Sequence, residues 1–310
     1  MSFQWVNSGP GGPWDRQILL LPPGGPGFRE PEPTKAIVYT GDPLAPYILK
    51  PASHSLADIS QMVVRHTNLI EGDAVSLEQT EAYNLYKRSI PFDENPEIVL
   101  QNFFEIFNHF LFGGTVKNSV VADCAVDERK NIVKLEFVSD EARAVEVDLG
   151  GDLGLTTCVD SGCFRTTYIY IKDVRNGNDR KEYFKAMHEM LGTLAHEMIH
   201  AMEFMYIRDE ELFDWAHHCT DWQKAAAAIE HATSGAPAGH DWFALKLNLG
   251  RLDSVLDDIV FMGNKEPTDL EILNMGFQVQ GFKERLGSLQ VRRLAHQWAV
   301  TNEELSYLWR

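Results

Sequence analysis

Apolar side chains recur at three- and four-residue steps in several stretches of the chain, which is the spacing of one buried face of a helix. The longest stretch covers residues 181–206 and keeps this spacing through Phe184, Met187, Leu191, Leu194, Met198, Met202 and Met205. Gly192 lies inside it and costs about 1 kcal/mol relative to alanine in a helix. We therefore expect a neighbouring backbone to approach closely at Gly192.

Shorter helices are predicted on both sides of this stretch. Residues 55–66 and 76–87 are amphipathic, and each begins with serine, a favourable N-terminal cap. A longer apolar run has Pro96 in its first turn and ends at Gly113 and Gly114, so both its start and its stop are marked. Further helices are expected at residues 214–232 and 240–249, and two or three more before Arg310.

Short runs of β-branched or alternating apolar residues predict strands. They lie at residues 120–124, 132–137, 144–147 and 166–171. The fold class is therefore α+β. Residues 1–50 are rich in proline and glycine and are expected to be largely extended. We divide the rest into a helical N-terminal extension over 51–95, a central domain over 96–250 and a helical C-terminal extension over 251–310.

The net charge of -17 argues against a large nucleic-acid-binding face, which needs lysine and arginine to displace phosphate counterions. One local basic cluster stands out, formed by Lys283, Arg285, Arg292 and Arg293. No apolar stretch is long enough to cross a membrane, and the start of the chain lacks the pattern of a signal peptide. With four cysteines and no CxxC pair, we expect an intracellular protein, in the nucleus or cytoplasm, without a membrane partner.

The strongest chemical signal is the HExxH pattern of His196, Glu197 and His200. Two imidazoles four residues apart lie on the same face of a helix, close enough to hold one zinc ion. Glu197, between them, could act as a general base beside an open coordination position. The alternative is a chance match, which arises in roughly a few per cent of chains with this many histidines and glutamates.

A catalytic zinc site needs a third protein ligand. His240 is favoured because it follows a flexible loop over residues 234–239 and opens an aromatic-anchored helix containing Trp242 and Phe243. His217 and His218 form a tempting cluster with Cys219, but their surroundings are acidic and look exposed. The candidates that stay open besides His240 are His217, His218, His231, Glu203, Glu210, Glu211 and Glu230.

Four segments, in order, resemble the SprT-like (Spartan-type) zinc metallopeptidases. They are residues 103–114 (FFEIFNHFLFGG), 168–171 (YIYI), 191–201 (LGTLAHEMIHA) and the pair Gly239 and His240 followed by Trp242 and Phe243. Asp241 stands where the family usually has glycine. The C-terminal 60 residues have neither the zinc ribbon of some relatives nor an evident motif for binding a clamp or ubiquitin.

The resemblance implies a zincin-like (minigluzincin-type) peptidase domain, with zinc held by His196, His200 and His240 and with Glu197 as the catalytic base. Its substrate would be a protein or peptide, including DNA-associated or DNA-crosslinked proteins. DNA as a partner follows from the resemblance and is disfavoured by the net charge. Two alternatives remain open: a DNA-independent intracellular amide hydrolase or peptidase, and a non-catalytic binding protein with a structural zinc. An intact Glu197 counts against the second, because a structural site has no use for a base.

Overall fold

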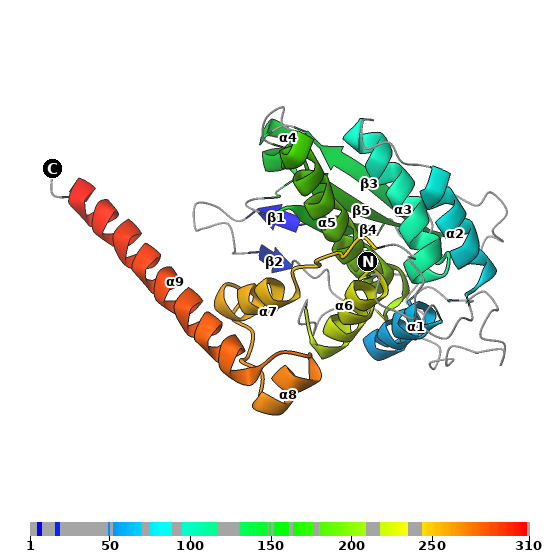
Figure 1. Cartoon of the computed structure of the whole chain (residues 1–310). Coiled ribbons are helices and arrows are strands. Elements are labelled where there is room, and N and C mark those ends of the chain that lie inside the picture. Colours follow the sequence, from blue (N-terminus) through cyan, green and yellow to red (C-terminus); the bar gives the residue numbers. More distant parts are fainter. Residues whose placement is uncertain are drawn as a thin grey trace, which may run out of the picture.

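The chain has an α+β fold in which helices surround a small three-stranded sheet (Figure 1). The computed structural model describes residues 5–7, 16–18, 49, 52–69, 75–88, 95–116, 130–139, 141–147, 149, 152–160, 164–175, 180–208, 218–234 and 244–308. The helices are α1 (Leu56–Asn68), α2 (Leu77–Arg88), α3 (Pro96–Phe112), α4 (Glu141–Glu146), α5 (Arg180–Tyr206), α6 (Thr220–Ala232), α7 (Arg251–Val260), α8 (Asp269–Asn274) and α9 (Val279–Leu308). The strands are β1 (Trp5–Asn7), β2 (Arg16–Ile18), β3 (Lys130–Val138), β4 (Gly154–Asp160) and β5 (Phe164–Lys172).

Local capping explains why the first helices start and stop where they do. Ser55 caps α1 through a capping box, in which its hydroxyl accepts from the backbone N–H of Asp58 at 3.1 Å and Oδ2 of Asp58 accepts from the N–H of Ser55 at 3.0 Å. Pro96 occupies the first turn of α3, and Gly113 ends that helix with a left-handed φ of 60°. These boundaries confirm the three helices predicted ahead of residue 113.

The sheet has the order β3-β5-β4, with β3 parallel to β5 and β4 antiparallel to it. Ile169 and Ile171 of β5 are buried in the main core together with apolar residues of α3 and α5, so these helices cover one face. Tyr170 points to the other face and packs near Ala144 of α4 and Leu149. The sheet places β4 on its edge, directly beside α5.

Helix α5 is the central element of the main core, and it begins and ends within one residue of the predicted stretch. Its Gly192 faces the backbone of residues 244–250, which we call the strap, and a Cβ at this position would overlap the carbonyl oxygen of Asn248. The close backbone approach expected at Gly192 is thereby confirmed.

Several sequence predictions fail in the described residues. Residues 144–147 belong to helix α4 and its end rather than to a strand; Arg143 pairs there with Glu146 at 2.9 Å and with Glu136 of β3 at 2.7 Å. Strand β4 was not predicted at all. The strap is not helical, and α6 starts at Thr220, later than expected. The strand expected at residues 120–124 lies outside the described residues.

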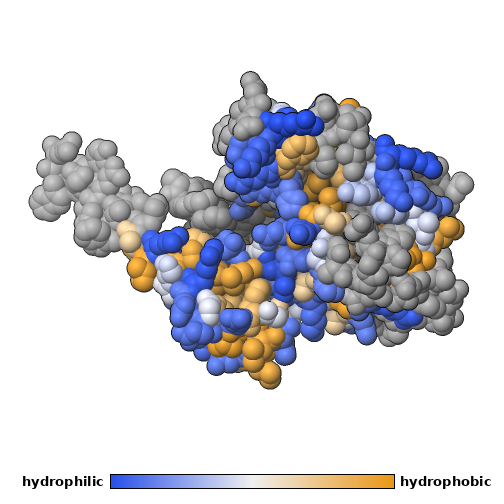
Figure 2. Space-filling model, in the orientation of Figure 1, coloured by the Kyte–Doolittle hydropathy of each residue, from blue (hydrophilic) through white to orange (hydrophobic). Residues whose placement is uncertain are grey.

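Helices α7, α8 and α9 form a C-terminal helical unit with a core of its own, made by Val255, Leu256, Val260, Ile272, Met275, Phe282 and Leu286. The C-terminal half of α9 extends away from the rest of the molecule (Figure 1). Figure 2 shows apolar surface over α8, where Leu270 and Leu273 are exposed. Among the described residues, no helix combines the length and apolar character needed to cross a membrane.

Candidate metal centre

The candidate site is built around the HExxH pattern, whose two histidines lie one turn apart on α5. Helix geometry brings Nε2 of His196 and Nε2 of His200 to 3.2 Å from each other. His200 is 7% exposed and His196 is half-buried, so both rings lie largely inside the fold.

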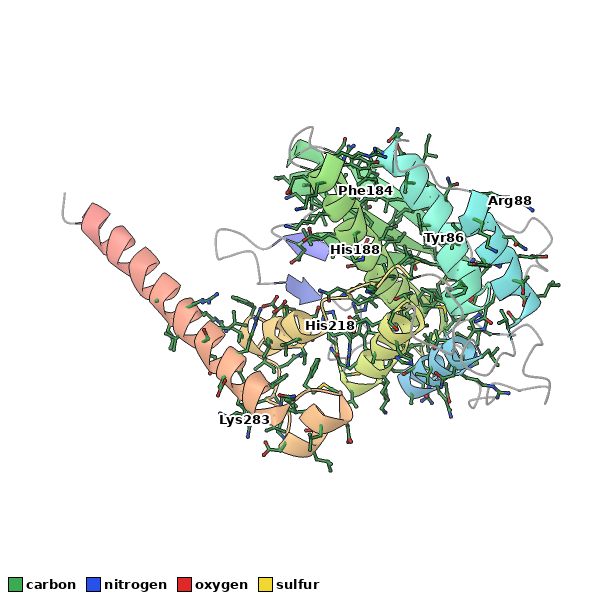
Figure 3. All side chains as sticks on the ribbon, in the orientation of Figure 1. Tyr86, Arg88, Phe184, His188, His218 and Lys283 are labelled. Atoms are coloured by element: carbon green, nitrogen blue, oxygen red, sulfur yellow. The ribbon has the colours of Figure 1, made fainter. Side chains whose placement is uncertain are left out.

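His218 completes a group of three converging ring nitrogens. It lies just ahead of α6, whose N-cap is Cys219, and Figure 3 places it where α6 and α7 meet. Nε2 of His218 is 3.1 Å from Nε2 of His196 and 3.2 Å from Nε2 of His200. Among the described residues, these three histidines are the group that could hold a metal ion.

The opposite ring nitrogens all face acceptors. Nδ1 of His196 donates to the carbonyl oxygen of Leu249 at 2.8 Å, and Nδ1 of His200 lies 2.8 Å from Oε2 of Glu203. Nδ1 of His218 is 3.2 Å from Oδ1 of Asp258, a close contact that lacks the geometry of a hydrogen bond. An imidazole that keeps its proton on Nδ1 carries a lone pair on Nε2. The surroundings therefore favour the tautomer in which all three lone pairs point to one place.

This arrangement fits a small divalent cation. Zinc binds imidazole nitrogen at about 2.0–2.1 Å, which in a tetrahedral site separates two nitrogens by about 3.3 Å. The three observed separations of 3.1–3.2 Å are close to that value. Burial lowers the pKa of His196 well below its usual value and, with the nearby histidines, keeps its ring neutral; burial also lowers the pKa of His200. Neutral rings are the form that binds metal.

Trp222 contacts all three imidazole rings. It is fully buried in the first turns of α6, four residues after His218. Its ring centroid lies 4.7 Å from that of His196, 5.6 Å from that of His200 and 4.7 Å from that of His218. Because one rigid side chain contacts all three rings, their orientations depend on each other.

Glu197 is buried against the edge strand β4. Thr156 donates a hydrogen bond from its hydroxyl to Oε2 of Glu197 at 2.7 Å and lies 3.1 Å from the Glu197 backbone oxygen. A Cβ at Gly154 would come within 2.9 Å of the Glu197 side chain, so glycine leaves the space that this carboxylate fills. Burial raises the pKa of Glu197, although His200 and the hydrogen bond from Thr156 oppose that shift.

Glu203, weighed above as a metal ligand, takes a different place. It is completely buried one turn beyond His200 and contacts the Nδ1 side of that ring, away from the converging Nε2 atoms. Burial raises its pKa well above the usual value, and Oε1 has no hydrogen-bond partner among the described residues. A cation bound by His200 would offset the cost of keeping this buried carboxylate ionised.

The other sequence candidates divide into two groups. Glu230 accepts a hydrogen bond from the N–H of Leu249 at 2.9 Å and so holds the strap, and His231 is exposed at the end of α6. His240, His217, Glu210 and Glu211 lie outside the described residues.

The structure brings His218, ranked below His240 in the sequence analysis, to His196 and His200. A sequence signal for it existed. His218 precedes a helix anchored by a buried aromatic residue, Trp222, which is the same criterion that favoured His240.

A scan against protein-family models and searches for similar curated proteins and similar solved structures found no match to this chain.

Proposed function

We propose that the chain is a zinc-dependent metallopeptidase, with a zincin-like domain of the SprT-like type, that hydrolyses peptide bonds in protein substrates. One observation carries the proposal: the Nε2 atoms of His196 and His200 on α5 and of His218 ahead of α6 converge within 3.2 Å of one another, and the residue after His196 is a buried glutamate. In this proposal the third ligand is His218 in place of His240.

The roles of the residues follow from their contacts. His196, His200 and His218 would hold zinc through Nε2. When bound, zinc supplies Lewis acidity, which polarises a carbonyl group and lowers the pKa of water. Thr156 fixes the Glu197 carboxylate at Oε2, and we assign Oε1 as the atom that accepts a proton from water and passes it to the leaving amine. Because burial raises the pKa of Glu197, this carboxylate takes up a proton more readily than an exposed one.

The donor set favours catalysis over a purely structural metal. Structural zinc sites usually have four protein ligands, whereas catalytic sites have three and keep one position open. Among the described residues, three ligand groups converge. A structural site would also gain nothing from burying the Glu197 carboxylate, which is 6% exposed, beside the metal.

The test combines metal analysis with cleavage of a generic unfolded protein. Glu197→Gln should keep its zinc and lose about 10²- to 10⁴-fold in turnover, since an amide cannot take the proton. Glu189→Gln is the matched control, because Glu189 is an exposed glutamate on the same helix. A strong chelator should abolish wild-type cleavage, and added zinc should restore it.

Two results would count against the proposal. Hydrolysis by Glu197→Gln at the wild-type rate would rule out Glu197 as the general base. Loss of helical circular dichroism on chelation, with no cleavage by the zinc-loaded protein, would instead favour a structural metal.

A further inference from the structure

We propose that Asp258, on the C-terminal helical unit, is a positioning residue that orients His218, so that this unit forms part of the metal centre. The inference rests on the three-histidine site of the proposed function and extends it to α7.

Asp258 contacts His218 at two points. Its Oδ2 accepts a hydrogen bond from the backbone N–H of His218 at 2.9 Å, and its Oδ1 lies 3.2 Å from Nδ1 of the same residue. One carboxylate thus contacts both the main chain and the ring. The carboxylate thereby restrains the ring next to the backbone of the same residue, and its negative charge beside Nδ1 favours a proton on that nitrogen and a lone pair on Nε2.

The carboxylate is itself held in place. Asp258 is 6% exposed, on the face of α7 that packs toward the rest of the molecule. A buried carboxylate is costly unless it is paired or hydrogen-bonded. The hydrogen bond from the His218 backbone and the close contact with the His218 ring supply partners, and α7 is fixed by the second hydrophobic core through Val255, Leu256 and Val260.

Arg251, the first residue of α7, joins this unit to α6. Its Nε donates to Oε1 of Gln223 at 3.1 Å, and Nε2 of Gln223 donates back to the Arg251 backbone oxygen at 3.1 Å. Nη1 of Arg251 lies 3.5 Å from Oε2 of Glu230, and Nη2 donates to the backbone oxygen of Met275. The guanidinium therefore links α6, α7 and the end of α8.

Residues 249–258 orient two of the three histidines. The Leu249 carbonyl accepts from Nδ1 of His196, and Asp258 contacts His218. The domain boundary expected at residue 250 therefore lies within the residues that orient the histidines of the site. Neighbouring groups that accept from the ring N–H in this way fix the tautomer and the orientation of metal-binding histidines.

The decisive variant is Asp258→Asn in the full-length chain. The asparagine oxygen can still accept from the His218 backbone, but its NH2 group then faces Nδ1 of the ring. That pairing favours the tautomer with the proton on Nε2, which cannot bind a metal. We expect zinc affinity, measured by competition with a chromophoric chelator, to fall about 10- to 100-fold.

Asp257→Asn is the matched control, since it makes the same substitution at the next residue of the same helix, which is more exposed than Asp258. The melting temperature of each metal-free variant separates a loss of folding from a loss of metal affinity. The visible absorption of the Co²⁺-loaded protein provides a second readout, because a misoriented His218 changes the ligand field. If Asp258→Asn and Asp257→Asn bind zinc equally well, the inference is overturned.

Asp258→Glu provides a second test if the asparagine variant does not fold. It keeps an acceptor-only carboxylate, so it should bind zinc more tightly than Asp258→Ala; equal affinities for these two variants would also overturn the inference. None of these measurements needs a peptidase substrate. Asp258-dependent zinc binding without cleavage would defeat the proposed function alone, and cleavage with Asp258-independent zinc binding would defeat this inference alone.

Discussion

At the scale of single residues, the site depends on which histidine joins the HExxH pair. His196 and His200 are fixed by their spacing on one helix, a local property that can be predicted from the sequence. His218 reaches them from outside α5, and its ring is oriented by Trp222 of α6 and Asp258 of α7. The sequence shows that a third metal ligand is needed, but it does not show which loop brings that ligand to His196 and His200.

This difference leads to a direct prediction about the third ligand. His218→Ala should reduce the zinc content of the purified protein to background, whereas His240→Ala should keep wild-type zinc, because His218 already fills the third corner of the nitrogen triangle. His231→Ala, which removes an exposed histidine at the end of α6, is the control. Elemental analysis after dialysis gives the answer. Full zinc in His218→Ala together with loss in His240→Ala would restore the original assignment.

At the scale of elements, the sequence predicts what local signals determine. Helices α1, α3 and α5 have clear caps or a long apolar repeat, and their bounds were predicted closely. Strand β4 was missed, although its Thr156 holds Glu197, because its residues from Gly154 to Asp160 show no strong alternation. The strap was predicted as a helix from its apolar spacing, but hydrogen bonds to Thr233 and Glu230 hold it in a non-helical conformation. Tertiary contacts decided both cases.

The contact between α5 and the strap gives a prediction about Gly192. A methyl group in Gly192→Ala would overlap the Asn248 carbonyl and push away the strap, whose Leu249 oxygen accepts from His196. We expect the free energy of unfolding to fall by about 1–3 kcal/mol and zinc to bind more weakly.

Gly281→Ala is the control for helix propensity, because a Cβ there meets nothing within 4 Å. It should be neutral or stabilise the chain by about 1 kcal/mol. Denaturant unfolding of the metal-free proteins and chelator competition provide the two measurements. A Gly192→Ala protein that is as stable as wild type and binds zinc as tightly would show that the strap does not support His196.

At the scale of the whole molecule, charge opposes the affinity for DNA that the family resemblance suggests. The net charge is -17, and several carboxylates lie around Asp257, beside the Asp258 that contacts His218. The pKa of Asp257 is raised to about 6 by partial burial and by the neighbouring carboxylates of Asp253, Asp152 and Asp258. The carboxylates that add to this shift make the local potential more negative, and such a potential repels phosphate.

The basic cluster near the C-terminus is also partly neutralised. Nζ of Lys283 lies 2.5 Å from Oδ1 of Asp269, and Nη2 of Arg285 lies 2.9 Å from Oδ1 of Asp253. The guanidinium of Arg293 stacks over Phe261, with 5.9 Å between its central carbon and the ring centroid. Binding to phosphate would have to compete with these contacts, although exposed ion pairs of this kind are weak.

We therefore expect DNA binding to be weak and its affinity to fall only gradually as the salt concentration rises. If all four basic side chains of the cluster were used, the slope of log K against log salt would be no steeper than about -4 on duplex DNA. A titration from low to physiological salt, run beside the cleavage assay with and without single-stranded DNA, measures both quantities. Lys283→Ala and Arg292→Ala should each flatten the slope by about one unit if the cluster is the contact.

Tight binding at physiological salt, or cleavage that requires DNA, would show that a local surface overrides the net charge and would favour DNA-bound proteins as the substrate. Cleavage that is indifferent to DNA would favour a peptidase that recognises its protein substrate directly.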